Sequence, residues 1–337
     1  MARKPIVQIM TPSGADLVGR LGSNLAGVTI VDQAGGESDT MDIRVRVPMP
    51  APAGPAKGTK YAPLIGWDPA GMRPAGIYTV QTTSLGGDPD SGYEMTISCR
   101  AADFVDKLKE VDSEHFDEMT AGDIFARIAA RAGTTAVVDP ELASIKLPYR
   151  LRWKEPAGEF AETLAQEIGG TMKIAGDRMA VLKRGASRSA SGAVLPRIRI
   201  DFASCHRFSV SIEERGRFAE ADGGWFDFQD GIEKLEIGKG LGTASRMLPV
   251  HIFSTQPQAK LAADASGHEE GRKSISGSFD MAGNLDATAE APVICTGFGA
   301  DIDGASMVAA CVTHEITFDD DGGWITTVEV EAREGSG

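Results

Sequence analysis

His314 and Glu315 are the pair of residues that most suggests chemistry, because a His-Glu step opens the helical zinc-binding motif of many proteases. The second histidine of that motif is missing, and Phe318 stands in its place. The surrounding residues alternate between apolar and polar side chains, which is typical of a strand and not of a helix. We therefore expect His314 to be structural and not a metal ligand.

Two other segments resemble ligand-binding loops only superficially. Residues 238–242 (GKGLG) lack the spacing of a dinucleotide-binding fingerprint, so we expect a flexible turn there. Residues 319–323 (DDDGG) lack the bidentate glutamate that completes a calcium loop, so we expect a charged hairpin turn. Whether an ion binds Asp319–Asp321 stays open at this point.

No other set of residues has the pattern of an active site. The acidic pairs 213–214 and 269–270 would point to opposite faces of a strand, and no Gly-x-Ser-x-Gly elbow is present. Cys99, Cys205, Cys295 and Cys311 are scattered without metal-binding spacing, and we expect them to be reduced core residues. We predict no catalytic, cofactor-binding or metal-binding residues, no cofactor, and no enzymatic activity.

Charge and composition exclude further classes of protein. The 337 residues carry a net charge of −14, so a phosphate-binding surface would need a local basic patch. Arg150, Arg152 and Lys154 alternate along one strand, and we expect them to form a solvated face. The longest apolar run, 307–312, is far shorter than the roughly 20 residues that span a bilayer, so we predict no membrane insertion.

The elements around these residues are mostly short strands. Residues 28–31, 41–47, 77–82 and 93–99 read as half-buried antiparallel strands, with an exposed Pro-rich loop at 48–58 and a turn at 88–92. A helix over 120–132 has Thr120 as its N-cap and Gly133 as its stop, and a second helix lies within 153–168. Later segments predict a strand at 208–212, a helix at 257–271 and a hairpin over 312–330.

These elements predict an α+β fold that is mainly β. We expect one domain over 1–100, a small α/β module over 101–184, a linker at 185–195 and a second domain over 196–337 that contains one helix.

The order of several sequence segments resembles the late-control D family of phage tail and baseplate hub proteins, which is related to the N-terminal hub part of type VI secretion VgrG spikes. The similar segments lie near residues 25–32, 43–47, 77–81, 97–104, 153–170 and 299–318, and the final Gly-Gly-Trp hairpin is also similar. Two places depart from the family pattern. They are Lys154-Glu155-Pro156, before the central helix, and residues 214–250, whose role the sequence does not reveal.

The resemblance implies two antiparallel β-barrel-like hub domains that flank the α/β module. It implies a homotrimeric ring that joins the sixfold tail tube to the threefold spike of a phage tail or related contractile injection system. The expected partners are the chain itself, the tube protein and the spike protein, with the tape-measure protein as a further candidate. DNA would pass only transiently through a lumen that we expect to be acidic. The expected location is the virion tail or baseplate, after assembly in the bacterial host cytoplasm.

Three alternatives remain. A VgrG-type secretion spike would continue into an oligonucleotide-binding-like domain and a β-helical needle, whereas this chain ends at Gly337, which favours a phage-type hub. A tail-associated cell-wall hydrolase is less favoured because no catalytic pair is evident. A carbohydrate-binding β protein would bind glycans without forming trimers. The type of particle, its contractility and the interface residues are not predicted.

Overall fold

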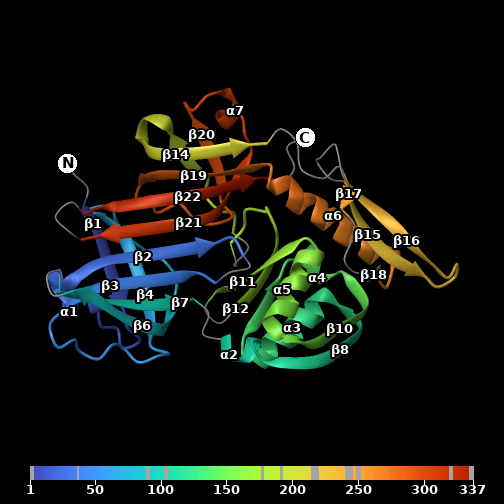
Figure 1. The fold of residues 1–337 in the computed structure, drawn as a ribbon, viewed down its shortest axis with the longest axis horizontal. Helices are drawn as coiled ribbons and strands as arrows, with labels where there is room; N and C mark the ends of the chain where they lie inside the picture. Colours follow the sequence, from blue (N-terminus) through green and yellow to red (C-terminus); the bar gives the residue numbers. More distant parts are fainter. Residues whose placement is uncertain are drawn as a thin grey trace.

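The computed structural model describes residues 4–35, 38–88, 92–101, 105–175, 178–189, 193–213, 220–239, 246–247, 252–318 and 322–333. A sheet of 13 strands runs through both ends of the chain (Figure 1). Its main path follows the order β1 (Lys4–Met10), β4 (Lys60–Asp68), β6 (Tyr78–Asp88), β7 (Gly92–Arg100), β3 (Thr40–Val47), β2 (Leu25–Gln33), β21 (Met307–Thr317), β22 (Trp324–Ala332), β19 (Ile275–Ala282) and β14 (Cys205–Ile212).

Several short strands and helices adjoin the main path of this sheet. Strand β5 (Gly71–Pro74) pairs with β4, and β20 (Pro292–Thr296) pairs with both β21 and β13 (Ile198–Asp201). Helix α1 (Leu17–Leu21) and the 3₁₀ helix η1 (Gly22–Asn24) precede β2, the 3₁₀ helix η2 (Phe202–Ser204) precedes β14, and α7 (Ala300–Asp303) follows β20.

Alternating side chains give the sheet one buried face, as the sequence predicts. The first arm, β1–β7, buries a core that includes Val28, Ile30, Ile43 and Ile97. The final arm, made of β13, β14 and β19–β22, buries a separate core around Phe279 and Val328. The strands expected at 28–31, 41–47, 77–82, 93–99, 208–212 and 312–330 are all present.

The α/β module lies beside the sheet (Figure 1). It contains α2 (Val105–Leu108), β8 (Val111–Thr120), α3 (Ala121–Ala132), β9 (Thr135–Val138), α4 (Pro140–Ala143), β10 (Lys146–Pro156), α5 (Ala157–Glu167), β11 (Gly170–Ala175) and β12 (Arg178–Lys183). The predicted cap of α3 is confirmed: the Asp123 backbone N–H donates to the Thr120 hydroxyl, and left-handed Gly133 ends the helix. The apolar face of α5 packs into the core of the module.

The expected solvated face at 150–154 is wrong for Arg150 and Arg152, whereas Lys154 is exposed. Arg152 is only 3% exposed, and its guanidinium donates to the backbone carbonyls of Glu155 (2.9 Å) and Glu110. Arg150 forms an ion pair of 2.6 Å with Glu167. Arg150 and Arg152 lie opposite Phe116 and Glu114, which are both buried, so this side of β10 faces inward, and the sequence pattern does not reveal that pairing.

Residues 213–274 form an insertion between β14 and β19. It contains the hairpin of β15 (Glu220–Asp227) and β16 (Ile232–Lys239), the short strands β17 (Arg246–Met247) and β18 (Ile252–Phe253), and helix α6 (Gln256–Arg272), the helix predicted at 257–271. The flexible turn expected at 238–242 is wrong at its start, because Gly238 lies in β16, where an added Cβ would meet the backbone of Ala263 at 2.4 Å. Residues 240–242 lie outside the described part.

The predicted fold class, α+β and mainly β, is confirmed. No sheet in the described residues closes into a barrel, so the barrel-like arms are open. All four cysteines are free, and Cys99, Cys295 and Cys311 are buried. Among the described residues, no helix is both long and apolar enough to span a membrane.

Candidate assembly interface

The two arms of the sheet have the same strand order. In the first arm, strands in the order β6-β7-β3-β2 lie side by side, and in the final arm the order is β21-β22-β19-β14. Each arm begins with one strand (β2 or β14), continues with its partner (β3 or β19) and ends with a hairpin (β6–β7 or β21–β22), and all these neighbours are antiparallel. The chain therefore contains a structural repeat of four strands.

The repeat extends to local irregularities. The β2–β3 pair has a register shift between Leu25 and Gly27, and the β14–β19 pair has one at Cys205 and Arg207. The two hairpins also share a shift, between Val80 and Thr82 in one and between Ala309 and Cys311 in the other. Because β-bulges are specific features and not random defects, two matching shifts in addition to the same strand order argue against a chance similarity of the arms.

The two arms join through the pairing of β2 with β21. Seven residue pairs, from Gly27 with Thr317 to Gln33 with Cys311, make one antiparallel ladder. Arg44 in the first arm also lies 3.9 Å from Glu315 in the final arm. The junction continues the sheet from one arm into the other, so it is an interface of the kind that could also form between chains.

Among the described residues, the outer edges of the two repeats have no strand partner of this length. Strand β14 is the last strand of the main sheet path. On β6, only Tyr78 and Thr79 pair with β4, and residues 82–88 are exposed. Leu85 is 51% exposed and Phe208 on β14 is 40% exposed. Open strand edges that carry apolar residues favour pairing with another chain.

His314, the first chemical candidate from the sequence, belongs to the core of the β21–β22 hairpin. Its Nδ1 lies 3.0 Å from the hydroxyl of Thr326, and the indole N–H of Trp324 points to it at 3.4 Å. Burial lowers the pKa of His314 to about 4, so its ring is neutral near pH 7. The expectation of a strand is confirmed here, and Asp319–Asp321 lie outside the described residues.

A cluster of three charged residues, Lys173, Asp32 and Asp39, connects the α/β module to the first arm. The Lys173 ammonium on β11 donates to the carboxylate of Asp32 and to the Gln33 carbonyl (3.0 Å), and it lies 3.1 Å from Asp39. Burial raises the pKa of Asp39 to about 6, although the Lys173 charge opposes this shift. For Lys173, burial lowers the pKa, but the two carboxylates outweigh it and the pKa is raised. Sequence reasoning missed this cluster, because nothing local relates Lys173 to Asp32.

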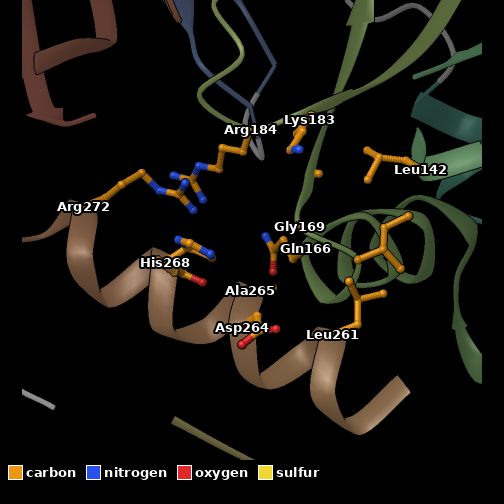
Figure 2. A pocket seen from close by; sticks show the side chains of 13 residues that line it. Leu142, Gln166, Gly169, Lys183, Arg184, Leu261, Asp264, Ala265, His268 and Arg272 are labelled. Atoms are coloured by element: carbon orange, nitrogen blue, oxygen red, sulfur yellow. The ribbon is translucent and has the colours of Figure 1, made fainter. Parts of the chain in front are cut away.

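A pocket of about 170 Å³ lies between α6 and the α/β module (Figure 2). Arg184 and Arg272 approach each other in it, and both lie near the carboxylate of Glu331 on β22, at 3.6 and 3.9 Å. These charges connect the residue that follows β12 with α6 and β22. Among the described residues, no group of three or more His, Cys, Asp or Glu side chains is arranged to hold a metal ion.

The comparisons with known proteins agree with this architecture. No family model matches the chain. A probable baseplate hub protein of Escherichia phage P2 is 26% identical over 357 residues, which cover 94% of this chain and 91% of that protein. A probable baseplate hub protein of Escherichia phage 186 is 24% identical over 365 residues, which cover 96% and 92%. The chain is similar to these two phage baseplate hub proteins over nearly its whole length.

Solved structures support the same fold. The tail protein from Neisseria meningitidis MC58 has a TM-score of 0.68 at 12% identity, and the similarity covers 97% of this chain and 96% of that one. The c3393 protein of E. coli, a component of the type VI secretion system, has a TM-score of 0.57 at 7% identity and coverage of 92% and 73%. The resemblance to baseplate hub proteins is thereby confirmed, and the fold is shared with a type VI secretion component. The names of the two phage relatives agree with the predicted location in a virion tail or baseplate.

Proposed function

We propose that this protein forms a homotrimeric ring that joins a sixfold tail tube to a threefold spike. The four-strand repeat is the observation that carries this proposal. Three chains with two similar arms each present six similar units, which suits a sixfold tube, while the chain count suits a threefold spike. In this proposal residues 1–100 and 196–337 are the hub domains, 101–184 is the module and 185–195 is the linker.

The two ends of the sheet suit two different partners. The antiparallel pairing sets the β6–β7 and β21–β22 turns at one end, so that end displays the repeat. The module follows β7 and the insertion lies between β14 and β19, and both therefore leave the opposite end (Figure 1). We assign the repeated end to the tube protein and the end with single-copy features to the spike protein, with the tape-measure protein as a further candidate partner.

The sheet face opposite the cores suits the wall of a channel. Strand alternation puts Thr and Ser side chains there, together with charged residues. The acidic residues are Asp42, Asp88, Glu94, Asp280, Glu315, Glu329 and Glu331, and the basic ones are Arg44, Arg46, Arg100 and Arg207. Acids outnumber bases, so DNA would pass this wall without binding strongly. A neutral or basic lumen in the assembled ring would contradict this part of the proposal.

The proposed role is structural and not enzymatic. The relatives from phages P2 and 186 are named as probable baseplate hub proteins, which supports that role. The fold similarity to a type VI secretion component keeps a VgrG-type spike component as the second candidate. A tail-associated cell-wall hydrolase is the least supported option, and a zymogram of the purified protein that shows lysis would revive it.

Mass measurement in solution tests the ring. Multi-angle light scattering of the purified chain, alone and with the spike protein of the same tail, should give three hub chains per complex. A monomer at high concentration that also fails to bind the spike protein would overturn the proposal. A stable dimer or hexamer would also exclude the threefold ring.

A further inference from the structure

We propose that β14 of one chain pairs with β6 of a second copy in the antiparallel register that β2 and β21 adopt within the chain. This inference rests on the proposed function, because it specifies how neighbouring chains meet in the ring. Within the chain, the first strand of the first arm pairs with the third strand of the final arm. The first and third strands that remain are β14 and β6, and in the described part of the chain both have an edge that no strand covers along most of its length.

The open edge of β6 matches the covered edge of β21. Strand β4 pairs with β6 only at Tyr78 and Thr79, and β20 pairs with β21 only at Met307 and Val308, which are the equivalent positions. Beyond them, β2 covers β21 from Cys311 to Thr317. The equivalent residues of β6, 82–88, are exposed. The same edge is therefore paired with a strand in one arm and, among the described residues, unpaired in the other.

The shared bulges fix the register. Aligning β14 with β2 and β6 with β21 at their register shifts makes Val210 equivalent to Ile30 and Leu85 equivalent to His314. Because Ile30 pairs with His314, Val210 should pair with Leu85. The same alignment gives the other pairs between β14 and β6. They are Arg207 with Asp88, Phe208 with Gly87, Ser209 with Gly86, Ser211 with Ser84, and Ile212 with Thr83.

These partners are chemically complementary. Leu85, Phe208 and Ile212 are 51%, 40% and 38% exposed. Their equivalents in the β2–β21 junction are His314, Val28 and Asp32, of which His314 and Val28 are buried. Pairing would bring the three apolar side chains together and extend both cores across the new junction.

Two further proposed pairs, Phe208 with Gly87 and Arg207 with Asp88, also favour a second copy of this chain as the partner. Phe208 would lie opposite Gly87, whose missing side chain leaves room for the ring. Arg207, whose Nη2 lies 2.8 Å from Asp280, would gain Asp88 as a second carboxylate across the junction. A second copy of this chain is therefore the partner that this edge fits.

Paired cysteines test the register directly. In a Cys205→Ser background, Ser211→Cys and Ser84→Cys should form a disulfide under mild oxidation, because both serines are exposed and directly opposite in the proposed pair. Seven strand spacings separate β6 from β14 within one chain, or roughly 30 Å, so the bond can form only between chains. Denaturing gels should show covalent dimers and trimers.

The matched control shifts the register by two residues. Ser209→Cys with Ser84→Cys keeps the same residue types and the same sheet face, but the proposed register separates their Cα atoms by roughly 7–8 Å, which is poor for a disulfide. Cross-linking of the control as efficient as that of the test pair overturns the register. A trimer by light scattering without cross-linking of the test pair overturns this inference and leaves the proposed ring intact. A monomer overturns both.

Discussion

Trp67 and Trp324 stack with their ring centroids 5.1 Å apart, although they lie in different arms of the sheet. The indole N–H of Trp67 donates to the carbonyl of Gly283 at 2.9 Å. An added Cβ on Gly283 would lie 2.1 Å from the ring of Trp324, so glycine is needed there for close packing. Trp324 also belongs to the core of the first arm, and the β21–β22 hairpin thus completes a core that the first arm begins.

Removal of the Trp324 ring should weaken this connection. Trp324 is 3% exposed, so Trp324→Ala leaves a cavity between the arms and should lower the free energy of unfolding by about 3–5 kcal/mol. Trp153→Ala is the matched control because that ring is 61% exposed and should change stability by less than about 0.5 kcal/mol. Urea unfolding followed by circular dichroism measures both. Equal losses in the two variants would contradict the assigned role of Trp324.

Lys173→Met should destabilise the contact between the module and the first arm. It leaves the carboxylates of Asp32 and Asp39 close together without their cation, at a cost on the order of 3 kcal/mol at pH 8. The pKa of Asp39 is already raised to about 6, and losing Lys173 should raise it further. An acid whose pKa is raised by folding destabilises the fold as pH rises through that value. The defect should therefore be smaller at pH 5 than at pH 8.

A second substitution distinguishes lost charge compensation from lost packing. Adding Asp39→Asn to Lys173→Met removes one of the two uncompensated charges, and it should restore part of the stability at pH 8 and little at pH 5. Urea midpoints at both pH values give the comparison. A pH-independent loss in Lys173→Met would show that the ammonium acts only by packing.

Glu290→Gln should stabilise the protein at alkaline pH. Burial raises the pKa of Glu290 from 4.5 to about 7, although the backbone N–H of Gly185 donates to its Oε2 at 3.2 Å. The folded state therefore favours the protonated acid, and stability from this group is present below pH 4.5 and lost as pH rises through 7. The variant should gain on the order of 2 kcal/mol at pH 8 and almost nothing at pH 4.5. Melting curves at the two pH values, with exposed Glu233→Gln as control, measure the gain, and the same shift in both variants would contradict it.

Gly223→Ala should displace the β15–β16 hairpin from α6. An added Cβ would lie 2.0 Å from the backbone oxygen of Ala259, so the strand must move away from the helix at a cost of about 1–3 kcal/mol. Gly323→Ala is a suitable control because no heavy atom lies within 4 Å of its added Cβ. Limited proteolysis of the hairpin and the fluorescence of Trp225 should change only in the first variant. An unchanged Gly223→Ala protein would show that the contact is loose.

Local patterns were sufficient to predict most elements of the fold. The alternation in β21, with Val312, His314 and Ile316 on one face, and the Thr120–Gly133 boundaries of α3 depend only on neighbours in the sequence. Arg152 was mispredicted because its pairing with Glu114 puts its side chain on the buried side of the β8–β10 pair, and no local signal marks that pairing. The role of Gly238 could not be predicted, because it depends on a helix more than twenty residues away.

The strand edges of the candidate interface could not be predicted from the sequence, because they too depend on residues that are distant along the chain. A strand edge is open or covered according to which distant strand pairs with it, and Leu85 looks like any other apolar strand residue in the sequence. The resemblance to hub proteins predicted two similar arms. The shared bulges at Gly27, Arg207, Thr82 and Cys311, which align these arms residue by residue, are visible only in the strand pairing.

The outer face of the β15–β16 hairpin is an apolar surface that occurs once in each chain. Phe226, Leu235 and Ile237 lie on the face turned away from α6 and are 37%, 42% and 48% exposed, and Ile252 on β18 adds a fourth apolar side chain. A surface without a counterpart in the first arm suits a threefold partner and not a sixfold one. We therefore expect it to contact the spike protein.

Replacing Phe226, Leu235 and Ile237 together by serine should abolish binding to the spike protein and leave the hub trimer intact, because the hairpin lies outside the β14 and β6 edges. Val111→Ser, a change at a residue that is 60% exposed on the α/β module, is the control and should retain binding. Light scattering reports the trimer, and size-exclusion chromatography with the purified spike protein reports the complex. If the triple variant becomes monomeric, the hairpin face contacts a neighbouring hub chain and not the spike. If it binds the spike as the control does, the assignment of this face is wrong.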